Sequence, residues 1–173
     1  TLVFEAQRIV DLNVEKLKDE EIKNSDIMFT STMIIQEDSQ NELIDRVHFF
    51  GKKIVAGGPF PTSYPEKNSR IDYIIRGEGE VVLRPFLEDL VKGVAQREYS
   101  EREIIQSGRN NFPLTKSGRP DIKHTPLPRW DLLDLKKYFS PAIQFSRGCP
   151  FDCEFCDITA IYGRESRTKS NEQ

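Results

Sequence analysis

Residues 41–59 read Asn-Glu-Leu-Ile-Asp-Arg-Val-His-Phe-Phe-Gly-Lys-Lys-Ile-Val-Ala-Gly-Gly-Pro, a pattern that predicts a helix, a turn and a strand. Four apolar side chains recur at helical spacing: Leu43, Ile44, Val47 and Phe50. Ser39 or Asn41 can cap the start of this helix, and Gly51 stands where a C-terminal glycine belongs. We expect residues 52–56 to form a short buried strand, which the following glycine pair stops.

The same alternation continues on both sides of this stretch. Short β-prone runs lie at 8–12, 26–30 and 72–76, and helix-prone runs lie at 14–23 and 80–92. Strands that alternate with helices along the chain are typical of a parallel sheet covered by helices. We therefore predict an α/β fold with a Rossmann-like parallel sheet, and such sheets bind ligands at the carboxyl ends of their strands.

The character of the chain changes between about residue 93 and residue 135, where glycine and proline interrupt any long element. Within this stretch, 104–106 and 119–122 could form a small hairpin. One more predicted strand, 142–146, leads directly into a group of cysteines. These changes predict three parts: an α/β domain over 1–95, a linker over 96–139, and the start of a second domain over 140–173.

Composition excludes several classes of protein. The 173 residues are 37% hydrophobic and 31% charged, with a formal net charge of -3, so no basic field favours nucleic acid. No apolar run approaches the roughly 18 residues that a membrane helix needs. The first residues, 1–5, lack the basic start and apolar stretch of a signal peptide. We expect a cytoplasmic protein with no membrane span.

The three cysteines, Cys149, Cys153 and Cys156, follow one another with C-x3-C-x2-C spacing. An odd number of cysteines at short spacing is a poor disulfide framework and a good metal site. Three thiolates in one tight loop can hold three corners of an iron–sulfur cube and leave the fourth iron open to a substrate. Gly148 and Pro150 suit a loop that wraps closely around such a core.

Two other interpretations stay open on spacing alone. The cysteines could bind zinc with a fourth ligand from elsewhere, for which His124 is a candidate, although no second cysteine pair exists. They could also be three unrelated thiols.

The flanks of the cysteines add a resemblance. Ser146-Arg147-Gly148 precedes the first cysteine and Phe155 precedes the last, after a predicted strand, and this pattern resembles the signature of the radical SAM superfamily. The resemblance implies a [4Fe–4S] cluster on the three cysteines, S-adenosylmethionine (SAM) on the open iron, and Phe155 beside the adenine. It also implies a 5′-deoxyadenosyl radical, a partial (β/α) barrel that begins with the strand before the loop, and an electron donor such as flavodoxin or ferredoxin.

Small and polar residues end the predicted strands of the first half. Taken singly, Ser31-Thr32 could simply end a strand, Gly57-Gly58 could be a tight turn, and 77–80 (Gly-Glu-Gly-Glu) could be a strand-to-helix turn. Their joint order resembles the cobalamin (B12)-binding domain found ahead of many radical SAM domains. That resemblance places six residues around the corrin and its tail: Ser31, Thr32, Gly57, Gly58, Gly77 and Glu78. Glycine would let the backbone approach a bulky flat ligand.

The sequence departs from the cobalamin pattern in two ways. It has no Asp-x-His-x-x-Gly stretch, and we interpret His48 as a helix-face residue and His124 as a loop residue. The family's first strand and helix would precede Arg8, and most of its barrel would follow Cys156. We therefore expect a fragment that lacks these parts and is inactive alone.

The resemblance implies an enzyme that cleaves SAM reductively for radical methylation, or for rearrangement or cyclisation. Its substrate would be an unidentified small-molecule or lipid-like compound. The alternatives are a non-catalytic cobalamin-binding fragment and a structural zinc-binding protein.

Overall fold

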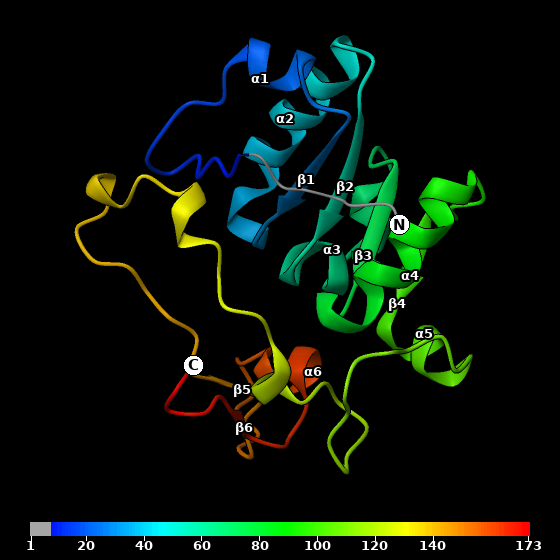
Figure 1. Cartoon of the computed structure of the whole chain (residues 1–173), viewed down its shortest axis with the longest axis vertical. Coiled ribbons are helices and arrows are strands. Elements are labelled where there is room, and N and C mark those ends of the chain that lie inside the picture. Colours follow the sequence, from blue (N-terminus) through cyan, green and yellow to red (C-terminus); the bar gives the residue numbers. More distant parts are fainter. Residues whose placement is uncertain (1–7) are drawn as a thin grey trace.

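The computed structural model describes residues 8–173, and its centre is a four-stranded parallel sheet (Figure 1). The strands follow one another in sequence order: β1 (Ile27–Ser31), β2 (Lys53–Gly57), β3 (Tyr73–Arg76) and β4 (Glu98–Ser100). All three pairings are parallel, with Thr30 opposite Ala56 and Ile74 opposite Glu98. The expected α/β fold with a Rossmann-like sheet is thus confirmed for this part of the chain.

Alternation along the strands gives the sheet two apolar faces. On one face, Ile54, Ala56 and Ile74 pack against Ile22 of α1 (Asp19–Lys23) and Val47 of α2 (Glu37–Phe49). The opposite face has its own core, which includes α4 (Gly79–Lys92) and α5 (Glu101–Gln106) and is made of Val55, Ile75, Val81, Val82, Phe86, Tyr99 and Ile104. Helices therefore cover both faces (Figure 1).

Several expected elements differ at their bounds. Helix α2 begins at Glu37, directly after the turn η1 (Ile34–Gln36), so neither Ser39 nor Asn41 is its cap. The helix expected over 14–23 is only α1, and 8–12 is not a strand. There the Asp11 carboxylate accepts a hydrogen bond from the Asn13 N–H at 2.9 Å, a local bond that favours a turn over an extended strand.

The stretch expected to be a linker contributes to the sheet. Strand β4 and helix α5 lie within it, so the sheet continues past residue 95. The hairpin prediction was wrong for residues 104–106, which are helical because the Ser100 hydroxyl caps α5 by accepting from the Glu103 N–H. Residues 119–122 keep one antiparallel bridge, Leu114 to Pro120.

The remaining elements are short. They are α3 (Pro59–Ser63), η2 (Pro65–Asn68), η3 (Ile122–His124), η4 (Trp130–Leu132), η5 (Leu135–Lys137), β5 (Ser146–Arg147), α6 (Ile158–Tyr162) and β6 (Arg167–Thr168). Strand β5 pairs antiparallel with β6. The strand expected over 142–146 is reduced to its last residue and Arg147, because Ile143 and Phe145 lie exposed without a partner strand among the described residues.

Strands β5 and β6 form a two-stranded ribbon, and the described chain contains no barrel. Figure 1 shows this ribbon and α6 below the sheet, beyond α3, at the side where the strands end. None of the helices within 8–173 has the length and apolarity needed to cross a membrane. The N-terminal residues in which we expected no signal peptide, and the first seven residues of the expected domain over 1–95, lie outside the described part.

Candidate functional site

The three cysteines lie on one loop, residues 148–166, which we call the cysteine loop. Its two ends are joined by β5 and β6, the stem, in which Ser146 faces Thr168 and Arg147 faces Arg167. Gly148 starts the loop with a φ of 82°, and a Cβ at this position would overlap the carbonyl oxygen of Glu165. Glycine is therefore required here both by the left-handed backbone and by the close approach of the returning chain.

The cysteine thiols are free and accessible. Cys149 and Cys156 are half-buried, Cys153 is exposed, and none forms a disulfide. Main-chain groups hold the loop: the Cys149 N–H donates to the Gly163 carbonyl at 3.2 Å, and the Cys156 N–H donates to the Cys153 carbonyl at 3.0 Å. Phe155 is 91% exposed beside the last thiol.

No three His, Cys, Asp or Glu side chains converge closely enough to hold a metal ion in residues 8–173. The proposed zinc ligand His124 lies in η3, where its Nε2 is 3.7 Å from the Asp121 carboxylate. The donor set itself fits an iron–sulfur cluster, because three unpaired thiols share a single loop whose ends are fixed.

Two strand ends meet at the carboxyl edge of the sheet, where cobalamin was expected. Ser31 is exposed at the end of β1 and Gly57 is half-buried at the end of β2. A Cβ on Gly58, whose φ is 89°, would lie 2.5 Å from the Ser31 hydroxyl and 3.2 Å from the Thr32 nitrogen. The absence of a side chain at Gly58 is thus required by the protein's own backbone.

Thr32 takes part in a buried network of side-chain hydrogen bonds. Its hydroxyl donates to the Gln40 side-chain oxygen, the Gln40 amide donates to Asn68 at 2.6 Å, and the Asn68 amide donates to the Tyr64 carbonyl at 2.8 Å. Thr32, Gln40 and Asn68 are all buried. The Thr32 hydroxyl is therefore engaged within the protein itself.

The other pair expected at cobalamin, Gly77 and Glu78, faces the protein interior. Gly77 has a φ of 86°, and a Cβ there would lie 2.6 Å from a carboxylate oxygen of Glu101. Glu78 is the N-cap residue of α4, and its own N–H donates to the Glu101 carboxylate at 2.9 Å. Its side chain is only 1% exposed.

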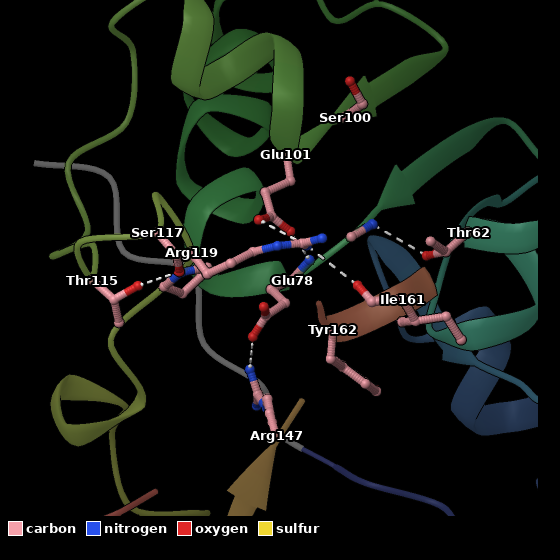
Figure 2. Close-up of polar contacts among 12 residues, drawn as sticks. Thr62, Glu78, Ser100, Glu101, Thr115, Ser117, Arg119, Arg147, Ile161 and Tyr162 are labelled. Carbon is pink, nitrogen blue, oxygen red and sulfur yellow. Dashed lines mark hydrogen bonds and ion pairs between the residues drawn. The ribbon is translucent and has the colours of Figure 1, made fainter. Parts of the chain in front are cut away.

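The carboxylate of Glu78 reaches both strands of the stem. One oxygen lies 2.7 Å from Arg147 Nη1, and the other lies 2.7 Å from Arg167 Nη2. We call Glu78, Arg147 and Arg167 the charged joint. Figure 2 shows Glu78 between the helices of the sheet domain and Arg147 on the stem.

A second contact runs from Glu101 to the end of the cysteine loop. Arg119 Nη1 lies 3.4 Å from the Glu101 carboxylate and donates to the Ile161 carbonyl of α6 at 3.3 Å (Figure 2). Burial raises the pKa of Glu101, while the Glu78 N–H and the charge of Arg119 oppose that shift. Burial alone would lower the pKa of Arg147, but its hydrogen bonds to Glu80 and Glu78 raise that pKa above the ordinary arginine value.

A groove of about 1440 Å³ separates the outer face of α4 from the segment that enters the stem. Its apolar lining includes Leu87 and Val91 on the helix and Ile143 and Phe145 on the segment. Because Ile143 is 78% exposed and Phe145 is 53% exposed, no apolar core forms between the two sides here. Polar contacts therefore provide much of the attachment between the sheet domain and the stem.

Sequence reasoning missed Arg147, Arg167, Glu101 and Arg119 as functional candidates. Arg147 was noted only as part of the signature flank. A signal existed in part, because Glu78 is a carboxylate between two glycines at a strand end, where a buried acid needs a basic partner.

Comparison with known proteins bears on the family. No protein-family model matches the chain. The chain is 40% identical over 168 residues to an uncharacterized methyltransferase of Synechocystis sp., a match that covers 96% of this chain and 28% of the relative. It is 31% identical over 166 residues to the hopanoid C-2 methylase of Rhodopseudomonas palustris, covering 96% of this chain and 29% of the relative.

A third relative is the anaerobic magnesium-protoporphyrin IX monomethyl ester cyclase of Synechocystis sp., which is 33% identical over 129 residues. That match covers 64% of this chain and 24% of the cyclase. The chain thus spans less than a third of the length of these curated relatives. With its cysteine spacing and its parallel sheet, the chain belongs to the radical SAM proteins that carry an N-terminal cobalamin-binding domain.

Proposed function

We propose that this chain is part of a cobalamin-dependent radical SAM enzyme that methylates its substrate or, as in the cyclase relative, closes a ring. The observation that carries the proposal is the cysteine loop: three free thiols lie on one loop, and the loop is fixed beside the carboxyl edge of a parallel sheet. That edge is where such sheets bind their ligands.

Cys149, Cys153 and Cys156 would hold the [4Fe–4S] cluster, and Phe155, exposed beside them, would contact the adenine of SAM. When bound, the cluster supplies the coordination site for SAM and the electron for its reductive cleavage. The loop's contribution is to present the three sulfur atoms from a short, closed stretch of chain. The electron would come from a partner such as flavodoxin or ferredoxin.

Cobalamin would bind at the carboxyl edge of the sheet, with Ser31 and Gly57 as its nearest contacts. Thr32, Gly58 and Gly77 have intramolecular roles there, since they are hydrogen-bonded or closely packed against the chain itself. Their contribution to the site would be its shape. The methylase relative named for hopanoids makes an apolar, lipid-like substrate the first class to test.

Anaerobic reconstitution of the 173-residue chain with iron and sulfide tests the cluster. We expect iron and sulfide to bind stoichiometrically with a visible thiolate-to-iron absorption band, and Cys149→Ala, Cys153→Ala and Cys156→Ala each to abolish it. Thr115→Ser, a substitution outside the ligand set, serves as the control. Unchanged iron content in all three cysteine variants would refute the ligand set, and stoichiometric zinc without iron uptake would favour a structural zinc site.

Titration of the same chain with hydroxocobalamin tests the second cofactor. A shift of the corrin spectrum and co-elution on gel filtration are the expected results. Neither change at saturating hydroxocobalamin would remove cobalamin from this part of the protein while leaving the cluster test unaffected.

A further inference from the structure

The stem places two positive charges face to face. Arg147 and Arg167 are register partners across an antiparallel pair, so their side chains start from adjacent positions on the ribbon. Like charges directly opposite each other in such a pair are destabilising. Something must therefore compensate them if the stem is to close the cysteine loop.

Two carboxylates from a different part of the chain supply that compensation: Glu80 pairs with Arg147 Nη2 at 2.8 Å, and of the two only Glu78 contacts both arginines. One Glu78 oxygen, Oε2, accepts from both guanidinium groups: from Arg147 Nη1 at 2.7 Å and from Arg167 Nη1 at 3.0 Å. The other, Oε1, lies 2.7 Å from Arg167 Nη2 as an ion pair without hydrogen-bond geometry. Glu78 is separated from Arg147 by 69 residues and from Arg167 by 89 residues. The carboxylate therefore joins the sheet domain to both strands of the stem at once.

The joint is buried, which makes each charge depend on the others. The side chains of Glu78 and Arg167 are 1% and 2% exposed, and that of Arg147 is 17% exposed. Arg167 also donates to the Pro120 carbonyl at 2.7 Å and to the Tyr162 carbonyl at 2.9 Å, while its buried Nε has no hydrogen-bond partner within 8–173. Removing one partner from a buried ion pair leaves an uncompensated charge, a strongly destabilising change.

Glu78 is itself held rigidly. It occupies the N-cap position of α4, its N–H donates to the Glu101 carboxylate, and the preceding Gly77 packs against the Glu101 side chain. Glu101 in turn meets Arg119, which bonds α6 at the far end of the cysteine loop. Movement of the loop relative to the sheet would have to break both contacts.

We propose that Glu78 is a positioning residue of the cysteine loop: its carboxylate, shared by Arg147 and Arg167, closes the stem and fixes the three thiols beside the carboxyl edge of the sheet. The sequence resemblance placed Glu78 at the cobalamin, but its oxygens are directed to the stem. The importance of Glu78 for the cluster rests on the proposed function, whereas its role in closing the stem does not.

Hydrogen exchange of the 173-residue chain without cofactors tests whether Glu78 closes the stem. The reporters are the Cys149 N–H, bonded to Gly163, and the Lys169 N–H, bonded to Phe145. We expect Glu78→Gln to raise exchange in peptides covering 145–169 by about tenfold or more, with exchange in β1 and β2 unchanged.

The control is Glu98→Gln, which removes the carboxylate of a half-exposed pair with Arg76 inside the sheet domain, 2.6 Å apart. It should leave exchange of 145–169 within about twofold of the wild-type protein, as for an exposed ion pair.

The double variant Glu78→Gln with Arg147→Gln removes one of the two opposed cations. It should restore part of the protection, an effect that a purely structural loss at Glu78 would not produce.

Unchanged exchange of 145–169 in Glu78→Gln would overturn the proposal, and so would an equal increase across the whole sheet. If that variant does not fold, Arg147→Gln alone carries the test, with an expected increase of about threefold in 145–169 only. Iron uptake is measured separately: a wild-type chain that takes up no iron refutes the proposed function, while the exchange result still decides the joint.

Discussion

The sheet domain and the cysteine loop are stabilised in different ways. The sheet has an apolar core on each face, made of fully buried side chains such as Ile54 and Phe86. The cysteine loop has no apolar core of its own, and it is held by a stem of two short strands with two residues each, by main-chain hydrogen bonds and by shared charges. Burial of apolar surface is non-directional, whereas the charged joint depends on geometry at three side chains.

The largest expected effect is in the sheet domain. Phe86 is fully buried and contacts the rings of Phe29, Tyr73 and Tyr99. Phe86→Ala should lower the free energy of unfolding by about 3–5 kcal/mol, since it removes apolar burial and leaves a cavity. Urea unfolding followed by circular dichroism measures it. A loss below about 1 kcal/mol would show that this face of the sheet is not the core.

A smaller, local effect is expected at the start of the cysteine loop. Gly148→Ala forces a side chain into a positive φ and against Glu165, which should weaken the stem by about 1–3 kcal/mol while sparing the sheet. Faster exchange of the Cys149 N–H is the measurement. Gly79→Ala is the matched control, because a Cβ there meets no atom within 4 Å and the residue is helical, so it should cost nothing.

The smallest effect concerns pH. Because burial raises the pKa of Glu101, its charged form is disfavoured in the folded state, and this residue lowers stability as pH rises above the ordinary glutamate value of about 4.3. Glu101→Gln is neutral at every pH. Relative to this variant, the wild-type protein should therefore lose free energy of unfolding as pH rises above about 4.3, the ordinary glutamate pKa.

Urea unfolding of both proteins at each pH decides that point. The charges of Glu78, Arg119 and Arg167 act on the Glu101 carboxylate in the wild-type protein only, so they are part of the difference that this comparison measures. A difference between the two proteins that stays constant with pH would mean that the Glu101 carboxylate is already compensated.

Sequence reasoning succeeded where apolar periodicity decides the structure. Strands β1 to β3 and helices α2 and α4 have apolar side chains at strand or helical spacing, so each could be predicted within a few residues. Strand β4 was missed because Tyr99 is its only apolar residue, and α3 because Pro59–Ser63 is too short to show a period.

The candidate site also has a part that the sequence predicts and a part that it does not. The cysteines could be found from local spacing alone, and whether they bind a cluster stays a prediction. The charged joint could not be found, because it depends on contacts between residues far apart in the sequence. Arg147 faces Arg167 across the stem, and Glu78 lies 69 residues before Arg147. Local patterns carry no information about such a register.

One consequence follows from how the cysteine loop is bonded. Its hydrogen bonds at Cys149 and Cys156 use main-chain N–H groups, and no disulfide involves any of the three sulfur atoms. The scaffold thus makes no use of sulfur. Alanine at these positions removes the ability to bind a soft metal and little else, which lets a loss of iron be attributed to the missing ligand and not to a collapsed loop.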